Sequence, residues 1–254
     1  MNDDITLEEY IAGGGKLSSP VNASPRYRGE LLRLMAVFVD SEMAGAAGFA
    51  DCINMAPGLK ERMIAARIVM EKFHHAERVL KLMEEFGANT ERYVCHHPWA
   101  RRHQRDSDLG LDRQPGDMRL NVFHYPINDW CDAVTMNHLM GLATVIQLSE
   151  LKECSYQPLA VAMTDIVVTE SKHSKLGTEG LNILINNGYD KPAIQASVDY
   201  WVPRVAATFG RLGSSRQEIY QRFALRKQDN EAQHANWRDQ AVRSLEAMGL
   251  TLSI

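Results

Sequence analysis

The sequence lacks an apolar run long enough to cross a lipid bilayer, because its most apolar stretches carry Glu42, Glu71 or Glu170 near their middle. It also lacks an excess of basic residues: the formal net charge is −4, which argues against nucleic-acid binding. The acidic start MNDDITLEEY has no apolar segment of a secretory signal. We therefore expect a cytoplasmic protein that binds neither membrane nor nucleic acid.

Cysteines with metal-site or redox spacing and a dinucleotide-binding glycine motif are missing as well. No two of the four cysteines have the C-x-x-C spacing, so we expect reduced and mostly buried thiols rather than disulfides. No G-x-G-x-x-G motif is present, which gives no sign of a bound flavin or nicotinamide cofactor. The cysteines are Cys52, Cys95, Cys131 and Cys154.

Strand-like alternation is absent over any useful length, and what replaces it is helical periodicity. Apolar residues recur every three or four positions from Tyr27 onward, with breaks at Pro57-Gly58, Gly87 and the segment NNGYDKP. The pattern predicts an all-α bundle. We expect an arm at 1–25, a single domain at 26–254 with a polar loop insertion at 88–125, and helices at 27–56, 59–87, 127–152 and 158–185, with two more in 190–250.

Two Glu-x-x-His pairs, Glu71 with His74 and Glu170 with His173, are the most informative motif. On a helix, residues three apart point the same way, so each pair offers an oxygen and an imidazole to one point. Ferritin-like carboxylate bundles hold two metals with two such pairs and one further glutamate from each of two other helices. A lone pair of this kind is often only a solvated pair on a helix surface. Two pairs at matching heights favour a metal site.

The position of the remaining acids can be tested against the turns. Glu42 lies 15 residues before Pro57 and Glu71 lies 14 after it, which places both at a similar height on antiparallel helices. The same test around Tyr156, the turn between the next two predicted helices, puts Gly141 opposite Glu170. Glycine offers no ligand. Either His138, the adjacent Asn137 or a water could fill that place.

Other histidines have simpler interpretations. His75 faces about 100° away from His74 on an ideal helix, so we expect it at the surface or behind the ligands. The loop residues Cys95, His96, His97 and His103 lack the spacing of a zinc site, and a role in the loop itself is the preferred interpretation.

Several segments in order resemble one known family. YRGELLRL, SEMAG, AARIVMEKFHH, HYPINDW, ECSYQPLAVAM, TESKH and LEAMGLTL are similar to segments of the catalytic subunit of bacterial phenylacetyl-CoA epoxidase, across roughly residues 25–252. That family comprises ferritin-like di-iron oxygenases of phenylacetate catabolism. The resemblance implies a ferritin-like bundle with extra C-terminal helices. By this resemblance the metal ligands of the family correspond to Glu42, Glu71, His74, Glu170 and His173. His138 would be the substitute ligand for the position that Gly141 leaves empty.

The resemblance also implies chemistry and partners. Two irons per chain, or manganese in their place, would activate O₂ and insert one oxygen into a small organic substrate such as an aromatic acyl-CoA. Glu42, Glu71 and Glu170 would be the catalytic carboxylates, and a separate reductase would supply electrons. Arg67 and the arginines of PWARRHQR would meet the phosphates of the coenzyme. A homodimer, or a hetero-oligomer with related subunits, is expected.

Three departures from the family keep alternatives open. The carboxylate of the third helix is Gly141 here, the acids that precede two ligand glutamates are Met70 and Thr169, and the chain stops soon after GLTLSI. One alternative is a non-catalytic structural subunit of a multicomponent oxygenase. Another is a ferritin-like iron-oxidising protein.

Overall fold

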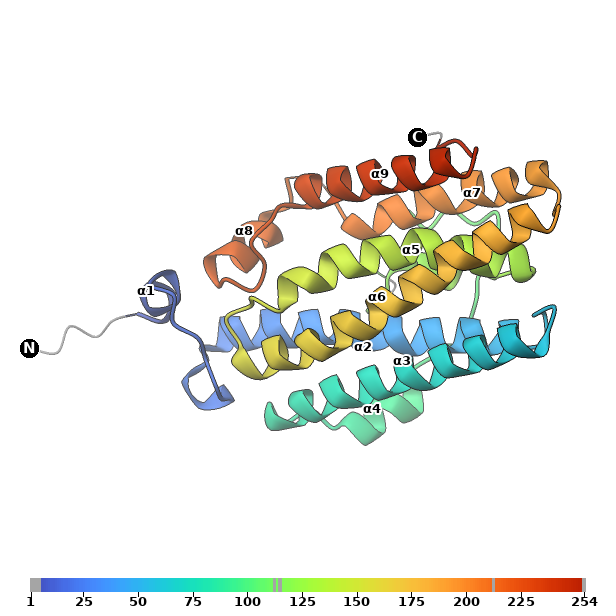
Figure 1. Cartoon of the computed structure of the whole chain (residues 1–254). Helices are drawn as coiled ribbons and strands as arrows, with labels where there is room; N and C mark the ends of the chain where they lie inside the picture. The colour runs from blue at the N-terminus through green and yellow to red at the C-terminus, as the bar shows by residue number, and fades with distance from the viewer. Residues whose placement is uncertain (1–5, 112, 114–115, 212, 253–254) are drawn as a thin grey trace, which may run out of the picture.

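Four long helices form two antiparallel hairpins that lie side by side in the computed structural model (Figure 1). The model describes residues 6–111, 113, 116–211 and 213–252. The all-α, ferritin-like bundle expected from the sequence is confirmed. Within these described ranges, no helix is both long and apolar enough to cross a membrane. The first hairpin consists of α2 (Pro25–Cys52) and α3 (Leu59–Glu85), and the second of α5 (Trp130–Leu151) and α6 (Gln157–Asn186).

The ends of these helices follow from local chemistry. Ser24 caps α2 by accepting a hydrogen bond from the Tyr27 amide, and Asp129 caps α5 by accepting from the Asp132 amide. Gly87 follows α3 with φ of 84°, a conformation that side chains other than glycine rarely adopt. The strongest sequence signals for starts and stops are therefore the ones that the structure uses.

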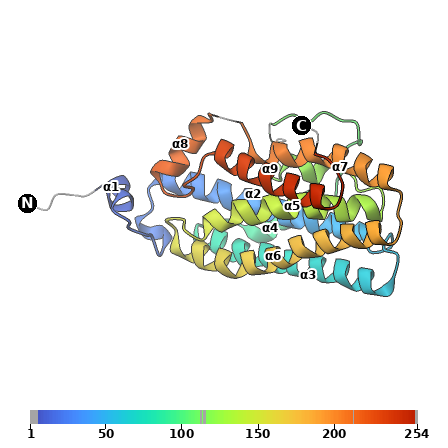
Figure 2. The ribbon, with the colours of Figure 1, turned by 45° about the horizontal axis from the view of Figure 1, so that its top comes forward.

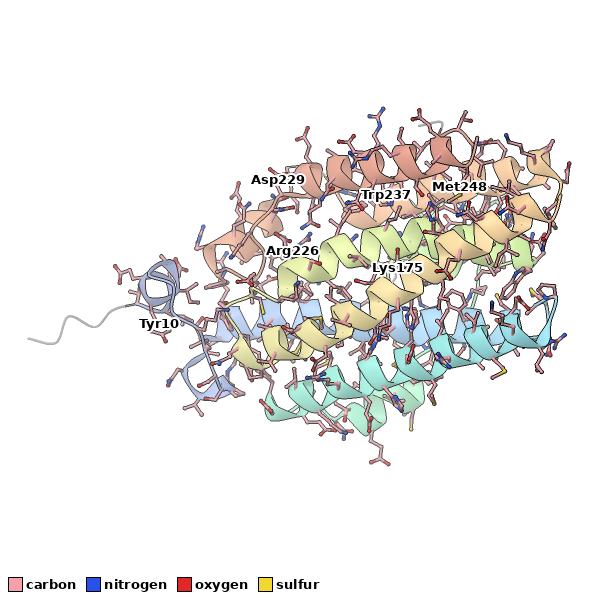
Figure 3. The ribbon with its side chains drawn as sticks, viewed as in Figure 1. Tyr10, Lys175, Arg226, Asp229, Trp237 and Met248 are labelled. Atoms are coloured by element: carbon pink, nitrogen blue, oxygen red, sulfur yellow. The ribbon has the colours of Figure 1, made fainter. Side chains whose placement is uncertain are left out.

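The C-terminal helices cover α5 on the side away from α3, as both views show (Figures 1 and 2). The described part of this region has three helices rather than the two expected: α7 (Lys191–Ala206), α8 (Ser215–Arg222) and α9 (Asn230–Ala247), with a 3₁₀ turn η3 (Ala207–Phe209) after α7. Trp237 points inward from α9 (Figure 3) and its indole donates to the Leu139 carbonyl of α5 at 3.0 Å. This contact anchors the outer layer to the bundle.

The segments expected as arm and loop contain short helices. The arm has α1 (Leu7–Ala12) and η1 (Pro20–Asn22), and residues 1–5 of the predicted arm lie outside the described residues. Leu17 pairs its backbone with both sides of the α5–α6 turn, through the Ser155 carbonyl and the Gln157 amide. The 88–125 segment has α4 (Thr90–His96) and η2 (Asn121–His124).

Helices α5 and α6 cross at very short distance because glycines line the contact. A Cβ placed on Gly141 would lie 2.8 Å from the Ser174 Cα, and one on Gly177 would lie 2.6 Å from the His138 amide nitrogen. Heavy atoms of side chains do not approach a backbone that closely. Gly141 is therefore a packing residue.

We predict that Gly141→Ala lowers the free energy of unfolding by about 1–3 kcal/mol, because the added methyl pushes α5 away from α6. Gly29→Ala is the matched control, since an exposed helical glycine with open space around it should gain about 0.5–1 kcal/mol from the same change. Urea titration of both variants measures the difference. Equal midpoints would contradict the tight crossing.

Candidate carboxylate site

Four buried side chains form what we call the central cluster: Glu42 on α2, Lys72 and His75 on α3, and Glu170 on α6. The ammonium of Lys72 donates to Glu42 Oε1 and to both carboxylate oxygens of Glu170, each at 3.1 Å. At most 8% of any of these three side chains is exposed. A buried charge requires partners of opposite sign, and Lys72 has them from two helices.

His75 completes the cluster one helical turn after Lys72. Its Nδ1 lies 3.1 Å from Glu42 Oε2 and 3.2 Å from Glu170 Oε1. Burial disfavours a charged imidazole, but hydrogen bonds to Glu170 and Glu42 outweigh it and raise the pKa of His75 to about 9. Burial also disfavours the ammonium of Lys72, yet the same two carboxylates raise the pKa of Lys72 above its ordinary value. At neutral pH two cations therefore balance two carboxylates.

His173 and Glu71 connect the central cluster to the surface. His173 Nδ1 lies 3.2 Å from Glu170 Oε1, and its Nε2 lies 2.6 Å from Glu71 Oε2. The Glu71 side chain is 34% exposed, whereas His173 is 2% exposed. Glu71 thus lies at the rim and is linked to the cluster by the His173 imidazole.

The structure corrects the predicted register of α3 by one residue. His74, expected as a ligand, is exposed, and His75, expected at the surface, is buried in the cluster. The height argument gives only the position along the helix axis, where neighbouring residues differ by about 1.5 Å, so it could not distinguish Glu71 from Lys72. One residue turns a helical side chain by about 100°, enough to exchange the inner and outer faces.

A signal in the sequence could have given the correct register. The buried residues of α3 recur every three or four positions, and Lys72 and His75 fall within that stripe. Lysine in an apolar stripe indicates a buried partner of opposite charge. The full stripe is Ala65, Ile68, Lys72, His75, Ala76, Val79 and Met83.

The structure brings Glu42, Glu170 and His173 close together, as their heights on the helices suggested. Donor atoms of Glu42, His75 and Glu170 lie within 4.8 Å of one another, so these three could hold one metal ion. The cation that they surround is the Lys72 ammonium. The residues present do not fit two irons, because that ammonium contacts three carboxylate oxygens and a fourth helix adds no carboxylate.

The vacancy expected at Gly141 is not filled by His138. His138 Nδ1 lies 3.0 Å from the Thr178 hydroxyl on α6, and His138 is in neither group of metal-binding geometry found in the described residues. Burial alone lowers the pKa of His138 to about 4. No carboxylate could stand at Gly141 either, because the close approach of Ser174 leaves no space for a Cβ.

The arginines expected to contact coenzyme phosphates make other contacts or lie away from the pocket beside Glu42. Arg67 is exposed on α3 and does not line the pocket that Glu42 borders. Arg102 donates to the Ala44 carbonyl at 2.9 Å, and Arg105 pairs with the buried Asp132. The arginines of PWARRHQR therefore include two that fasten the loop to the bundle.

The loop residues Cys95, His96 and His103 are exposed and do not gather. His97 differs, because its ring is buried and faces two aspartates, Asp40 of α2 and Asp117 of the loop. No motif in the sequence indicates this second buried group.

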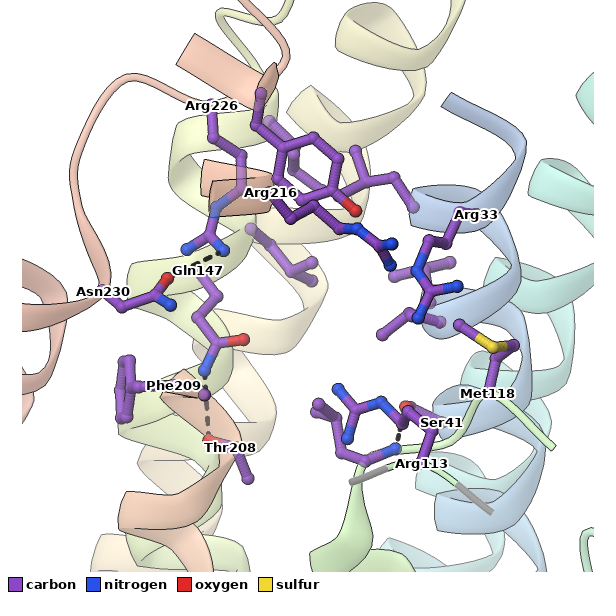
Figure 4. A pocket seen from close by; sticks show the side chains of 18 of the residues that line it. Arg33, Ser41, Arg113, Met118, Gln147, Thr208, Phe209, Arg216, Arg226 and Asn230 are labelled. Carbon is purple, nitrogen blue, oxygen red and sulfur yellow. Dashed lines mark hydrogen bonds between the residues drawn. The ribbon is translucent and has the colours of Figure 1, made fainter. Parts of the chain in front are cut away.

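A pocket of about 330 Å³ opens between α2, α5 and the α8 region. Glu42 of the central cluster lies in its wall together with Ser41. Guanidinium groups of Arg33, Arg113 and Arg216 gather on one side, as Figure 4 shows. Its wall also has an apolar part, made by Leu34, Val37, Phe38, Met140, Leu148 and Phe209.

The fold and the central cluster together define the class: an all-α carboxylate bundle with charged groups from facing helices in its core. The family model for phenylacetic acid catabolic proteins matches residues 17–253, and the chain belongs to that family. Membership implies a role in phenylacetic acid catabolism and relates the chain broadly to di-iron oxygenases that work in multicomponent assemblies. No curated protein matches the chain.

We predict that His138 makes the protein sensitive to acid. The folded pKa of His138, about 4, lies below the ordinary histidine value of 6.5, so its contribution to stability is fully present above about pH 6.5 and is lost as pH falls toward 4. Between about pH 7.5 and about pH 5, the wild type should lose about 2 kcal/mol more stability than His138→Gln. Urea titration at both pH values measures this.

His74→Gln is the control for that experiment, because it makes the same exchange at an exposed position of α3. Identical pH dependence of wild type and His138→Gln would show that His138 accepts a proton in the folded protein.

Proposed function

We propose that this chain is a non-catalytic subunit of the multicomponent oxygenase in which its family works. The observation that carries the proposal is the position of the Lys72 ammonium, 3.1 Å from Glu42 and from both oxygens of Glu170. In a di-iron bundle of this type the position three residues before the ligand histidine holds a glutamate. Here Lys72 precedes His75 by three residues and supplies positive charge in place of a ligand.

The charge balance of the central cluster supports the proposal. Lys72 and His75 already neutralise Glu42 and Glu170, because the two carboxylates raise the pKa of both cations. A divalent ion would have to displace the ammonium or lie beside it, and unscreened like charges in a buried site repel strongly. The bundle thus keeps a stable core without a metal centre.

A scaffolding role also needs a surface for a partner. The outer sides of α3 and α6 carry large apolar side chains that are exposed in the single chain. Exposed apolar groups on neighbouring helices are typical of protein interfaces. They are Leu59, Met63, Met70 and Phe73 on α3 and Val161, Val168 and Ile183 on α6.

A second candidate is the iron-dependent oxygenase that the sequence predicts, acting on a small molecule and O₂ with electrons from a reductase. It is favoured by the convergence of Glu42, His75 and Glu170 within 4.8 Å and by the pocket that reaches Glu42. This candidate requires the Lys72 side chain to leave the cluster.

Iron binding distinguishes the two candidates. After anaerobic incubation with ferrous iron, wild type and Glu170→Gln should retain equal amounts of iron, because the central cluster holds none. Lys72→Glu should retain about one iron more per chain, since the change creates a Glu-x-x-His pair with His75 opposite Glu170. Iron is measured by mass spectrometry after removal of excess metal.

Lys175→Glu is the matched control, because it makes the same charge change at an exposed position of α6 (Figure 3). It should bind no additional iron. Two irons per wild-type chain that disappear in Glu170→Gln would overturn the structural role and establish the oxygenase.

A further inference from the structure

Asp40, His97 and Asp117 form a second buried group, which we call the loop cluster. Asp40 lies on α2, His97 directly follows α4, and Asp117 lies in the loop before η2. His97 Nε2 lies 2.9 Å from Asp40 Oδ2 and 3.4 Å from Asp117 Oδ1. The side chain of His97 is 2% exposed, that of Asp40 1% and that of Asp117 6%.

The Nε2 atom of His97 lies within ion-pair distance of both carboxylates. Neither ring nitrogen has a hydrogen-bond partner of good geometry among the described residues. Leaving a buried polar group unpaired is costly, so such a group calls for an explanation. A metal ion held by all three residues would give Nε2 a partner.

Metal coordination accounts for this geometry. Around a tetrahedral zinc ion with bonds of about 2.0–2.1 Å, ligand atoms lie about 3.3 Å apart, and none of them points directly at another. The two distances from His97 Nε2 lie on either side of that spacing. One ligand atom from each of the three residues lies within 4.8 Å of the others.

The surroundings hold both carboxylates in place. The Tyr93 hydroxyl donates to Asp40 Oδ1, and the Arg119 Nε donates to Asp117 Oδ2 at 2.8 Å. Backbone amides of Met118 and Arg119 reach the facing oxygens at 2.7 and 3.0 Å. Outer partners of this kind orient metal-binding carboxylates in proteins. The other face of the site is closed by Trp99, whose ring stacks on His97.

We propose that Asp40, His97 and Asp117 bind one divalent transition-metal ion, with zinc the best fit. One imidazole and two carboxylates suit zinc, whereas calcium and magnesium prefer six or more oxygen ligands. A water molecule completes the coordination. The site is separate from the central cluster and does not depend on the role proposed for it.

The bound ion joins the 97–117 loop to α2. Met118 and Leu120, which follow the loop cluster, line the pocket beside Glu42, and the Leu120 amide donates to the Ser41 hydroxyl at 3.0 Å. The metal therefore fixes one wall of the pocket. It acts as a structural ion with no role in catalysis.

Zinc binding by the full chain tests the proposal. Dialysis against micromolar zinc, followed by metal analysis, should give about one zinc per wild-type chain. His97→Ala and Asp117→Asn should each weaken zinc affinity at least about tenfold. His96→Ala, which removes the exposed neighbouring histidine, and Glu170→Gln, which alters the central cluster, should leave zinc binding unchanged.

A readout on the wild type alone guards against variants that do not fold. Zinc should slow tryptic cleavage after the exposed Arg101 and raise the melting temperature. No zinc bound by the wild type, zinc retained by both loop variants, or zinc lost in Glu170→Gln would each overturn the proposal.

Discussion

The charge balance at Lys72 is the constraint on which the rest of the bundle depends. Glu42, Glu170 and His75 come from three helices, and the ammonium at their centre joins those helices through charged hydrogen bonds. Removing one partner of such a buried set typically costs about 3–5 kcal/mol, because the remaining charges are left without compensation. The same contacts make the core specific: a helix turned by one residue would bury Glu71 and leave two carboxylates unpaired.

Close packing of α5 against α6 helps to keep the charged groups of the central cluster away from water. The glycines at the α5–α6 crossing bring the two backbones together, which keeps Glu170 and His173 in a dry interior. A carboxylate on the facing side of α5 would force the helices apart and add a third negative charge. Gly141 and Lys72 are thus two consistent departures from a metal-binding bundle: one removes a donor, and the other supplies a charge in place of an ion.

The fold was predictable because it depends on periodicity and helix caps, which are local. The long helices, the breaks at Pro57 and Gly87, and the vacancy at Gly141 were all visible in the sequence. The Glu-x-x-His motif alone does not show which residues of α3 face the core. Only the buried stripe that contains Lys72 shows which side of the helix points inward. The loop cluster could not be predicted from the sequence, for a different reason. Asp40, His97 and Asp117 meet only through tertiary folding of a polar segment, and no spacing rule connects them.

Arg119 shows what fixes that polar segment. Its side chain is fully buried, pairs with Asp117, and donates to the carbonyls of Pro98, Trp99 and Arg101. A lysine would keep the charge but could not supply this fork of donors. Positions in this loop therefore differ in how well they tolerate substitution. Exposed positions such as Arg101 and His103 can vary freely over evolutionary time, whereas even the mildest exchange at Arg119 would cost the loop its shape.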